Sequence, residues 1–120
     1  MNPHMVLQLC DANGHRFFGT GPYRLLLGVE ELGSLRAAAQ SMGMAYSKAH
    51  HMIQTAESEL GFPLTQRVIG GRGGGGSTLT EGARALMKHY EAYAEACDRA
   101  AQELFTQHFA DFDPARYHTD

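Results

Sequence analysis

Residues 33–61 of the chain read GSLRAAAQSMGMAYSKAHHMIQTAESELG, and this stretch decides the fold. Ser34 offers an N-cap for a short helix. The apolar residues of that helix recur at i, i+3, i+4 and i+7: Leu35, Ala38, Ala39 and Met42. Gly43 follows as a left-handed turn residue, and a longer helix is predicted from Ala45 or Tyr46 to Leu60, ended by Gly61. Two helices joined by such a turn are typical of a helix-turn-helix.

The longer helix has two unlike faces. Its apolar stripe consists of Ala49, Met52, Ile53, Ala56 and Leu60. The opposite face carries Ser47, His51, Gln54 and Ser58, flanked by Lys48, His50 and Thr55. This face lacks acids and can form hydrogen bonds, as a helix that enters the major groove of DNA must. The small residues Ala39 and Gly43 are expected to let the two helices cross closely. An ordinary helical hairpin in a bundle core is the alternative.

A glycine-rich hairpin is predicted directly after this helix pair. Its strands are 64–69 and 77–79, joined by a loop over 70–76 in which Arg72 is the one charge. In a winged helix such a hairpin lies along the phosphate backbone or the minor groove. Gly71, Gly73 and Gly76 also satisfy the G-x-G-x-x-G pattern of nucleotide-binding loops. That alternative lacks a βαβ unit and a Walker-type lysine, and a strand intervenes before the next helix.

The segments on either side complete a mainly α fold with small β ribbons. Asn13-Gly14 between apolar runs at 5–9 and 15–18 predicts a β-hairpin, and a helix is expected from Pro22 to Leu32. A final helix opens at Thr80, and a heptad seam along it predicts a homodimer: Leu86, Tyr90, Tyr93, Cys97, Ala100 and Leu104. Packing of Tyr90, Tyr93 and Cys97 within one monomer is the alternative.

One domain is expected over residues 1–112, a winged helix-turn-helix with a long C-terminal dimerisation helix. Its parts are an N-terminal β-hairpin (1–19), a three-helix core (22–61), a wing (64–79) and the dimerisation helix (80–112). Residues 113–120 are expected to fray.

Composition restricts the function. The 120 residues are 43% hydrophobic and 19% charged, which fits a globular chain without a membrane span, and no secretory signal is recognised. The cytoplasm is therefore expected, with Cys10 and Cys97 as reduced thiols. Net charge is −3, but residues 34–78 carry four bases against two acids (+2) and the remainder six against eleven (−5). The basic segment indicates an anionic partner.

Catalysis and metal binding find no support. The adjacent His50 and His51 point about 100° apart on a helix and cannot readily chelate one ion. No catalytic Ser, His and Asp or Cys and His grouping can be assembled, so no enzyme activity, metal or cofactor is expected.

The chain resembles the winged-helix N-terminal domain of the molybdate-responsive regulator ModE, which is close to the LysR-type DNA-binding domain. The most specific part is 70–77 followed by Leu79-Thr80 and Gly82, which looks like the ModE wing running into its linker helix. Residues 33–49 resemble the family's helix-turn-helix, and 60–64 its exit into the wing. The resemblance implies DNA binding through the helix at Tyr46 and a wing contact at Arg72, dimerisation from Thr80, and molybdenum-related target genes. His50 stands where the family often has tryptophan, and no residue here is expected to sense oxyanions.

The leading hypothesis is a homodimeric regulator that binds double-stranded DNA, with no small-molecule effector identified. Its predicted DNA contacts are Ser34, Arg36, Tyr46, Ser47, Lys48, His50, His51, Gln54, Arg67 and Arg72. The second hypothesis is a protein-interaction or adaptor module that keeps the winged-helix shape but has lost DNA affinity. A histidine-based pH or metal sensor is the third.

Overall fold

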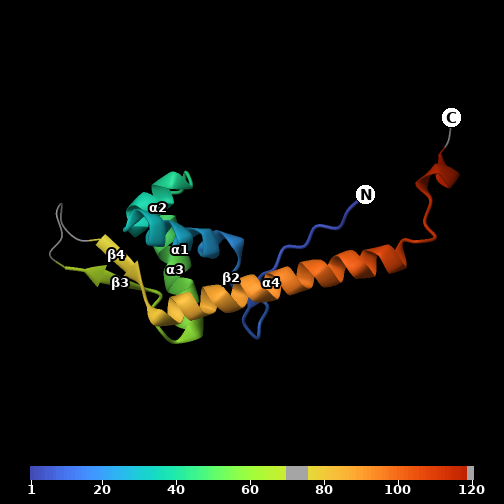
Figure 1. Ribbon diagram of the computed structural model, residues 1–120. Helices are drawn as coiled ribbons and strands as arrows, with labels where there is room; N and C mark the ends of the chain where they lie inside the picture. Colours follow the sequence, from blue (N-terminus) through green and yellow to red (C-terminus); the bar gives the residue numbers. More distant parts are fainter. Residues whose placement is uncertain (70–75, 119–120) are drawn as a thin grey trace.

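A computed structural model of the protein describes residues 1–69 and 76–118. Its elements, in chain order, are β1 (Leu9–Cys10), β2 (Arg16–Phe18), α1 (Thr20–Leu32), α2 (Leu35–Ser41), α3 (Tyr46–Leu60), β3 (Thr65–Val68), β4 (Gly76–Leu79), α4 (Glu81–His108) and a 3-10 turn η1 (Pro114–Tyr117). The three short helices pack together, β3 and β4 extend to one side, and α4 runs past them and away (Figure 1). The fold is a winged helix-turn-helix with a long C-terminal helix, as the sequence predicted.

The two β-sheets are antiparallel hairpins of two strands each. β1 pairs with β2, with an irregularity in register between Leu9 and Cys10. β3 pairs with β4 from Thr65 opposite Leu79 to Val68 opposite Gly76. We call the first pair the N-terminal hairpin (residues 9–18) and the second the wing.

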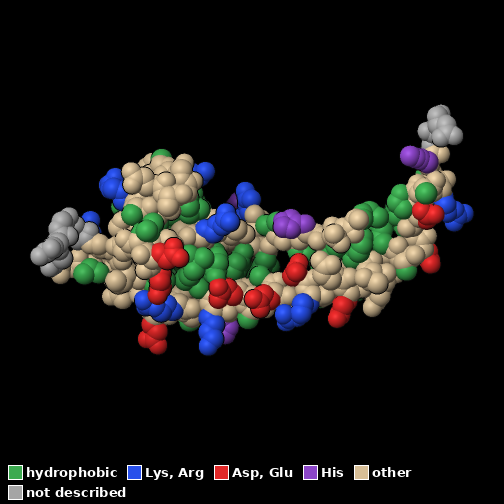
Figure 2. All heavy atoms as spheres, turned by 45° about the horizontal axis from the view of Figure 1, so that its top comes forward, with side chains coloured by type: hydrophobic (Ala, Val, Ile, Leu, Met, Phe, Trp, Pro, Cys, Tyr) green, Lys and Arg blue, Asp and Glu red, His purple; other side chains and the backbone are tan. Residues whose placement is uncertain are grey.

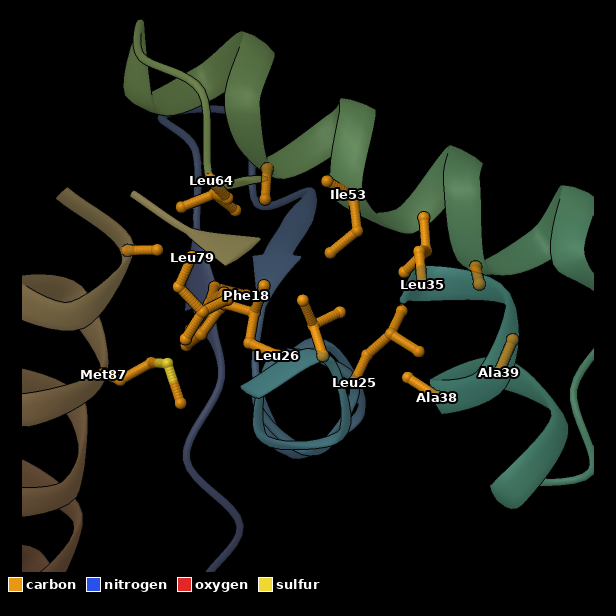
Figure 3. Packing of buried hydrophobic residues seen from close by; sticks show 14 of the residues in the cluster. Phe18, Leu25, Leu26, Leu35, Ala38, Ala39, Ile53, Leu64, Leu79 and Met87 are labelled. Atoms are coloured by element: carbon orange, nitrogen blue, oxygen red, sulfur yellow. The ribbon is translucent and has the colours of Figure 1, made fainter. Parts of the chain in front are cut away.

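One hydrophobic core joins the helices, the wing and the start of α4. Phe18, Leu25, Leu26 and Leu64 are fully buried there, and Leu79 and Ile53 pack among them (Figure 3). α4 contributes Ala83, Met87 and Tyr90. The Phe18 and Tyr90 rings meet edge to face, with their centroids 5.2 Å apart. The core therefore fixes both the wing and the first part of α4 to the helix-turn-helix.

Several element boundaries differ from those expected. β1 is Leu9–Cys10, whereas a strand over 5–9 was expected, because the chain before it packs toward α4: the Tyr90 hydroxyl donates to the Leu7 carbonyl at 2.7 Å. α1 begins two residues before Pro22, at Thr20. At the other end, Pro114–Tyr117, expected to fray, form the 3-10 turn η1, and the Asp113 carboxylate accepts from the Ala115 N–H at 3.1 Å.

A second close helix contact, between α1 and α2, involves a residue that the sequence did not single out. Ala39 is buried as expected and Gly43 has a left-handed φ of 65°. However, Gly28 of α1 lies against Ala38 of α2, and a Cβ at Gly28 would come within 2.7 Å of the Ala38 Cβ. The absence of a side chain at Gly28 therefore sets the distance between α1 and α2.

Candidate nucleic-acid interface

α3 presents one polar face to solvent. Ala49, Ile53 and Ala56 are buried against α1 and α2, so the opposite face points outward. This face carries Ser47, Lys48, His51 and Gln54, all of them exposed. The first turn of α3 contains no acid. An exposed helix face with a cation, amides and hydroxyls and without carboxylates in its first turn can approach an anionic, hydrogen-bonding surface such as a DNA groove.

Three of the predicted contact residues form one cluster at the start of α3. The Arg36 guanidinium lies over the Tyr46 ring, 4.3 Å from its centroid. The Tyr46 ring in turn lies beside His50, with the ring centroids 5.9 Å apart and the planes tilted by 33°. The cation–π contact joins α2 to α3 and leaves all three side chains exposed.

Ser34 has a structural role in this arrangement. Its hydroxyl oxygen accepts from the Ala37 backbone N–H at 2.9 Å and so caps α2, as the sequence predicted. The neighbouring Gly33 carbonyl accepts from the Ser77 N–H at 2.8 Å. This second bond links the turn between α1 and α2 directly to β4, and it fixes the wing to the helix-turn-helix.

The base of the wing is held by one side-chain and one backbone hydrogen bond. A Glu57 carboxylate oxygen accepts from the Leu64 N–H at 2.7 Å, and the Thr80 N–H donates to the Leu64 carbonyl at 3.0 Å. Arg67 lies exposed on β3, opposite Ser77. Arg72, predicted at the tip of the wing, lies outside the described residues.

The N-terminal hairpin lies against the same helix, a contact that the sequence did not predict. Asp11, His15 and Arg16 of the hairpin face α3 across a groove of about 340 Å³, whose other wall includes His51, Gln54, Thr55 and Ser58. Asp11 holds the turn: its carboxylate accepts from the Asn13 N–H at 2.8 Å and the His15 N–H at 3.0 Å. The pKa of Asp11 lies below its ordinary value, chiefly because of the His15 N–H bond. Asn13-Gly14 between two apolar runs predicted the hairpin, but nothing in the local sequence indicated that it lies against α3.

The residues predicted for dimerisation divide into two groups along α4. Leu86 and Tyr90 pack on the protein's own core. Beyond them Tyr93 and Leu104 are 56% and 51% exposed, Ala100 is exposed and Cys97 is half-buried. Figure 2 shows apolar side chains gathered on the distal part of this helix. Three rings continue the apolar surface there, with centroids 4.8 Å apart for Phe105 and Phe109, and 5.8 Å for Phe109 and Phe112.

Among residues 1–69 and 76–118, no three His, Cys, Asp or Glu side chains come close enough to hold a metal ion. In the same part of the chain, no helix combines the length and the apolar character needed to span a membrane.

Residues 22–84, which include the helix-turn-helix and the wing, match the family described as "Bacterial regulatory helix-turn-helix protein, lysR family". The chain belongs to this family. LysR-family membership makes it a regulatory protein, in agreement with the expectation that it is not an enzyme.

ModE proteins are among the sequence relatives of this LysR-family chain. It is 38% identical over 85 residues to the molybdenum transport protein ModE of Azotobacter vinelandii, covering 68% of this chain and 32% of that protein. It is 32% identical over 68 residues to the transcriptional regulator ModE of Haemophilus influenzae, covering 57% of this chain and 27% of that protein. The resemblance to ModE is thereby confirmed, and the chain spans about a third or less of the length of these relatives.

Solved LysR-type structures share the fold. The LysR family transcriptional regulator VV2_1132 aligns with a TM-score of 0.52 and 25% identity over 76% of this chain and 29% of its own. The DNA-binding domain of CbnR, solved as a DNA complex, aligns with a TM-score of 0.55 and 22% identity over 72% of this chain and 94% of its own.

Proposed function

We propose that the protein is a transcriptional regulator that binds double-stranded DNA sequence-specifically as a homodimer. The observation that carries this proposal is the outward face of α3, where Lys48 and Gln54 are exposed and the first turn is free of acids. In this proposal α3 enters the major groove and the wing lies along the backbone. Ser47, His51 and Gln54 read base edges, while Lys48, Arg36, Arg67 and Arg72 contact bases or phosphates.

The other predicted residues, Ser34, Tyr46 and His50, are proposed to position the side chains that contact DNA. Arg36, Tyr46 and His50 form one connected cluster, so Tyr46 holds the Arg36 guanidinium in place for a phosphate. Ser34 caps α2, and in this proposal the start of that helix faces a DNA phosphate. Because relatives are molybdenum transport and regulator proteins, we extend the proposal to molybdenum-related target genes.

A second copy of the chain is proposed to cover the distal half of α4. Half-buried Ala94, Cys97, Ala101 and Phe105 continue the stripe that α4 uses against its own core. They recur every three or four residues, so they lie on one side of the helix. Small residues in the middle of such a stripe let a partner helix approach closely.

The first test is the affinity of the protein for DNA. Fluorescence anisotropy against duplexes selected from a random pool measures the affinity of the wild-type protein at two salt concentrations. Lys48→Ala should weaken binding by about 1–3 kcal/mol, whereas Lys88→Ala, which removes an exposed cation from α4, should leave it unchanged. Equal affinities of the wild-type protein and Lys48→Ala would contradict this docking.

The net charge of −3 favours one competing function, an adaptor that binds protein through the same surfaces. Salt distinguishes the two functions. Affinity for DNA falls steeply as salt rises because counterions are released, whereas an apolar protein interface is much less sensitive. A protein that binds no duplex at low salt would support the adaptor.

A further inference from the structure

We propose that the N-terminal hairpin is a second phosphate-contacting arm, placed on the opposite side of α3 from the wing, with Arg16 as its cation. This inference rests on the proposed DNA binding and adds to it a surface that the helix-turn-helix and the wing do not include.

The first observation is the placement of the two hairpins at opposite ends of α1. β2 ends at Phe18, and α1 begins two residues later at Thr20. At the other end, Gly33 directly follows α1 and accepts the hydrogen bond from Ser77 of the wing. Thirteen helical residues separate these points, a distance of about 20 Å. Figure 1 likewise places β2 and the wing on opposite sides of α3.

The second observation is that α3 passes between them with its polar face accessible to the N-terminal hairpin. β2 and α1 both contact α3, and a Cβ at Gly21 would meet the Met52 methyl at 3.0 Å. Arg16 borders two adjoining grooves, of about 430 and 340 Å³, and His51 and Thr55 border both as well. The Arg16 side chain therefore lies next to the outward face of α3.

The dimensions of DNA fit this arrangement. The major groove is about 12 Å wide and has a phosphate backbone on each side. A helix in the groove with arms on both sides, about 20 Å apart, brings one arm to each backbone. Phosphate contacts of this kind fix the orientation of the protein without reading sequence.

The charges of the hairpin also permit an anionic partner. Arg16 is exposed, and the side chain of His15 is 80% exposed. The acid of the turn, Asp11, is occupied by the Asn13 and His15 backbone N–H groups, and its carboxylate lies 3.4 Å from the His15 Nδ1. Glu59 also lines the groove. We therefore expect a single added contact per protomer, made by Arg16.

The hairpin precedes the residues that match the LysR family, which begin at 22. A DNA contact from Arg16 would thus come from outside the residues that match the family.

The test compares Arg16→Ala with Arg16→Lys and with Arg99→Ala, which removes an exposed cation from α4. Binding of each variant to a duplex selected by the wild-type protein is measured by anisotropy between 50 and 200 mM salt, roughly the range over which phosphate contacts are resolved. Arg16→Ala should weaken binding about three- to tenfold at low salt and reduce the slope of log affinity against log salt by about 1 per hairpin. Arg16→Lys should retain most of the affinity, and Arg99→Ala all of it.

Hydroxyl-radical footprinting of the same complexes locates the contact. Wild-type protein should protect both backbones beside the major groove that α3 enters, and Arg16→Ala should lose protection on one of them. If Lys48→Ala weakens binding but Arg16→Ala changes neither slope nor footprint, the hairpin proposal is wrong and the proposed function stands. If the wild-type protein binds no duplex, both are wrong. If Arg16→Ala weakens binding and Arg16→Lys restores nothing, the hairpin has a structural role and the phosphate contact is excluded.

Discussion

Gly28 of α1 lies in contact with Ala38 of α2, and its lack of a side chain has a measurable consequence. A Cβ there would lie 2.7 Å from the Ala38 Cβ and 3.2 Å from the Ala38 Cα, and the helix backbone cannot yield easily. Gly28→Ala gains about 1 kcal/mol in helix propensity but overpacks the crossing by about 1–3 kcal/mol. We expect a net loss in the free energy of unfolding, measured by urea denaturation.

The control for this prediction is Gly28→Ala combined with Ala38→Gly, which removes the Cβ that the new methyl group would meet. The nearest remaining atom would be the Ala38 Cα, at 3.2 Å. Ala38→Gly alone costs about 1 kcal/mol in helix propensity, so independent effects would make the double variant less stable than Gly28→Ala by about that amount. A double variant as stable as Gly28→Ala, or more stable, supports the steric contact, whereas a full additive loss would show that α2 can shift at little cost.

Gly28 also illustrates what the sequence could not predict at this scale. The pattern of small residues correctly placed Ala39 in the core and Gly43 in a left-handed turn. A glycine inside a helical pattern, however, carries no information about which other helix it touches. The contact with Ala38 depends on the crossing of α1 and α2, which local spacing does not determine.

At the scale of elements, Thr80 joins the start of α4 to the wing. Its hydroxyl accepts from the Ala83 N–H at 3.0 Å and donates to the Pro63 carbonyl at 2.7 Å, in a nearly buried position. Thr80→Val keeps the shape but removes both bonds and leaves the Ala83 N–H and the Pro63 carbonyl without this partner. We expect a loss of about 1–3 kcal/mol in the free energy of unfolding, measured by thermal or urea denaturation.

The conservative variant Thr80→Ser separates the hydrogen bonds from packing. Serine retains the hydroxyl and should recover most of the loss, at the cost of one methyl group. If the valine variant were as stable as the wild-type protein and the serine variant were destabilised, the methyl group and not the hydroxyl would be what matters at this position.

The helices and the wing could be predicted because their signals are local. Ser34 caps α2 and Gly61 ends α3 in a left-handed conformation, as the sequence indicated. The first strand was predicted less well. Residues 5–7 belong to an apolar run before a turn signal, which predicts a strand, but the Leu7 carbonyl binds the Tyr90 hydroxyl, 83 residues further along the chain. A partner so distant in sequence cannot be read from periodicity.

The same limit applies to the candidate interface. The polar face of α3 follows from a helical projection, and the structure places Ser47, Lys48, His51 and Gln54 on an exposed surface. The proximity of Arg16 to His51 depends on how the N-terminal hairpin packs against α3, which is a tertiary contact. The sequence therefore predicted the exposed polar face of α3 but not the hairpin that lies beside it.

At the scale of the whole molecule, α4 makes the protein elongated. Its radius of gyration is 19.2 Å, whereas a compact chain of this length has about 14 Å. The difference arises because the distal half of α4 leaves the core and carries its apolar stripe with it (Figure 2). A partner helix is the simplest cover for that stripe.

Self-association provides the prediction at this scale. Ala101→Glu places a charge on the half-buried stripe and should raise the dimer dissociation constant at least tenfold, about 1.4 kcal/mol, by sedimentation or light scattering. Ala92→Glu makes the same change on the exposed opposite face of α4 and should leave the dimer intact. A monomeric wild-type protein, or equal association of the two variants, would count against pairing through this stripe.

If two copies pair through α4, the length of this helix sets the spacing between the two DNA half-sites that the dimer binds. The 28 residues of α4 form a rod of about 42 Å, and an insertion of one heptad would lengthen it by about 10 Å while turning its faces by only about 20°. In a two-fold symmetric pair, a heptad inserted in each copy between domain and axis would separate the two recognition helices by about 20 Å more, or roughly six base pairs. An insertion or deletion in this one helix would thus change the half-site spacing that a relative binds, while every base-contacting side chain stays the same.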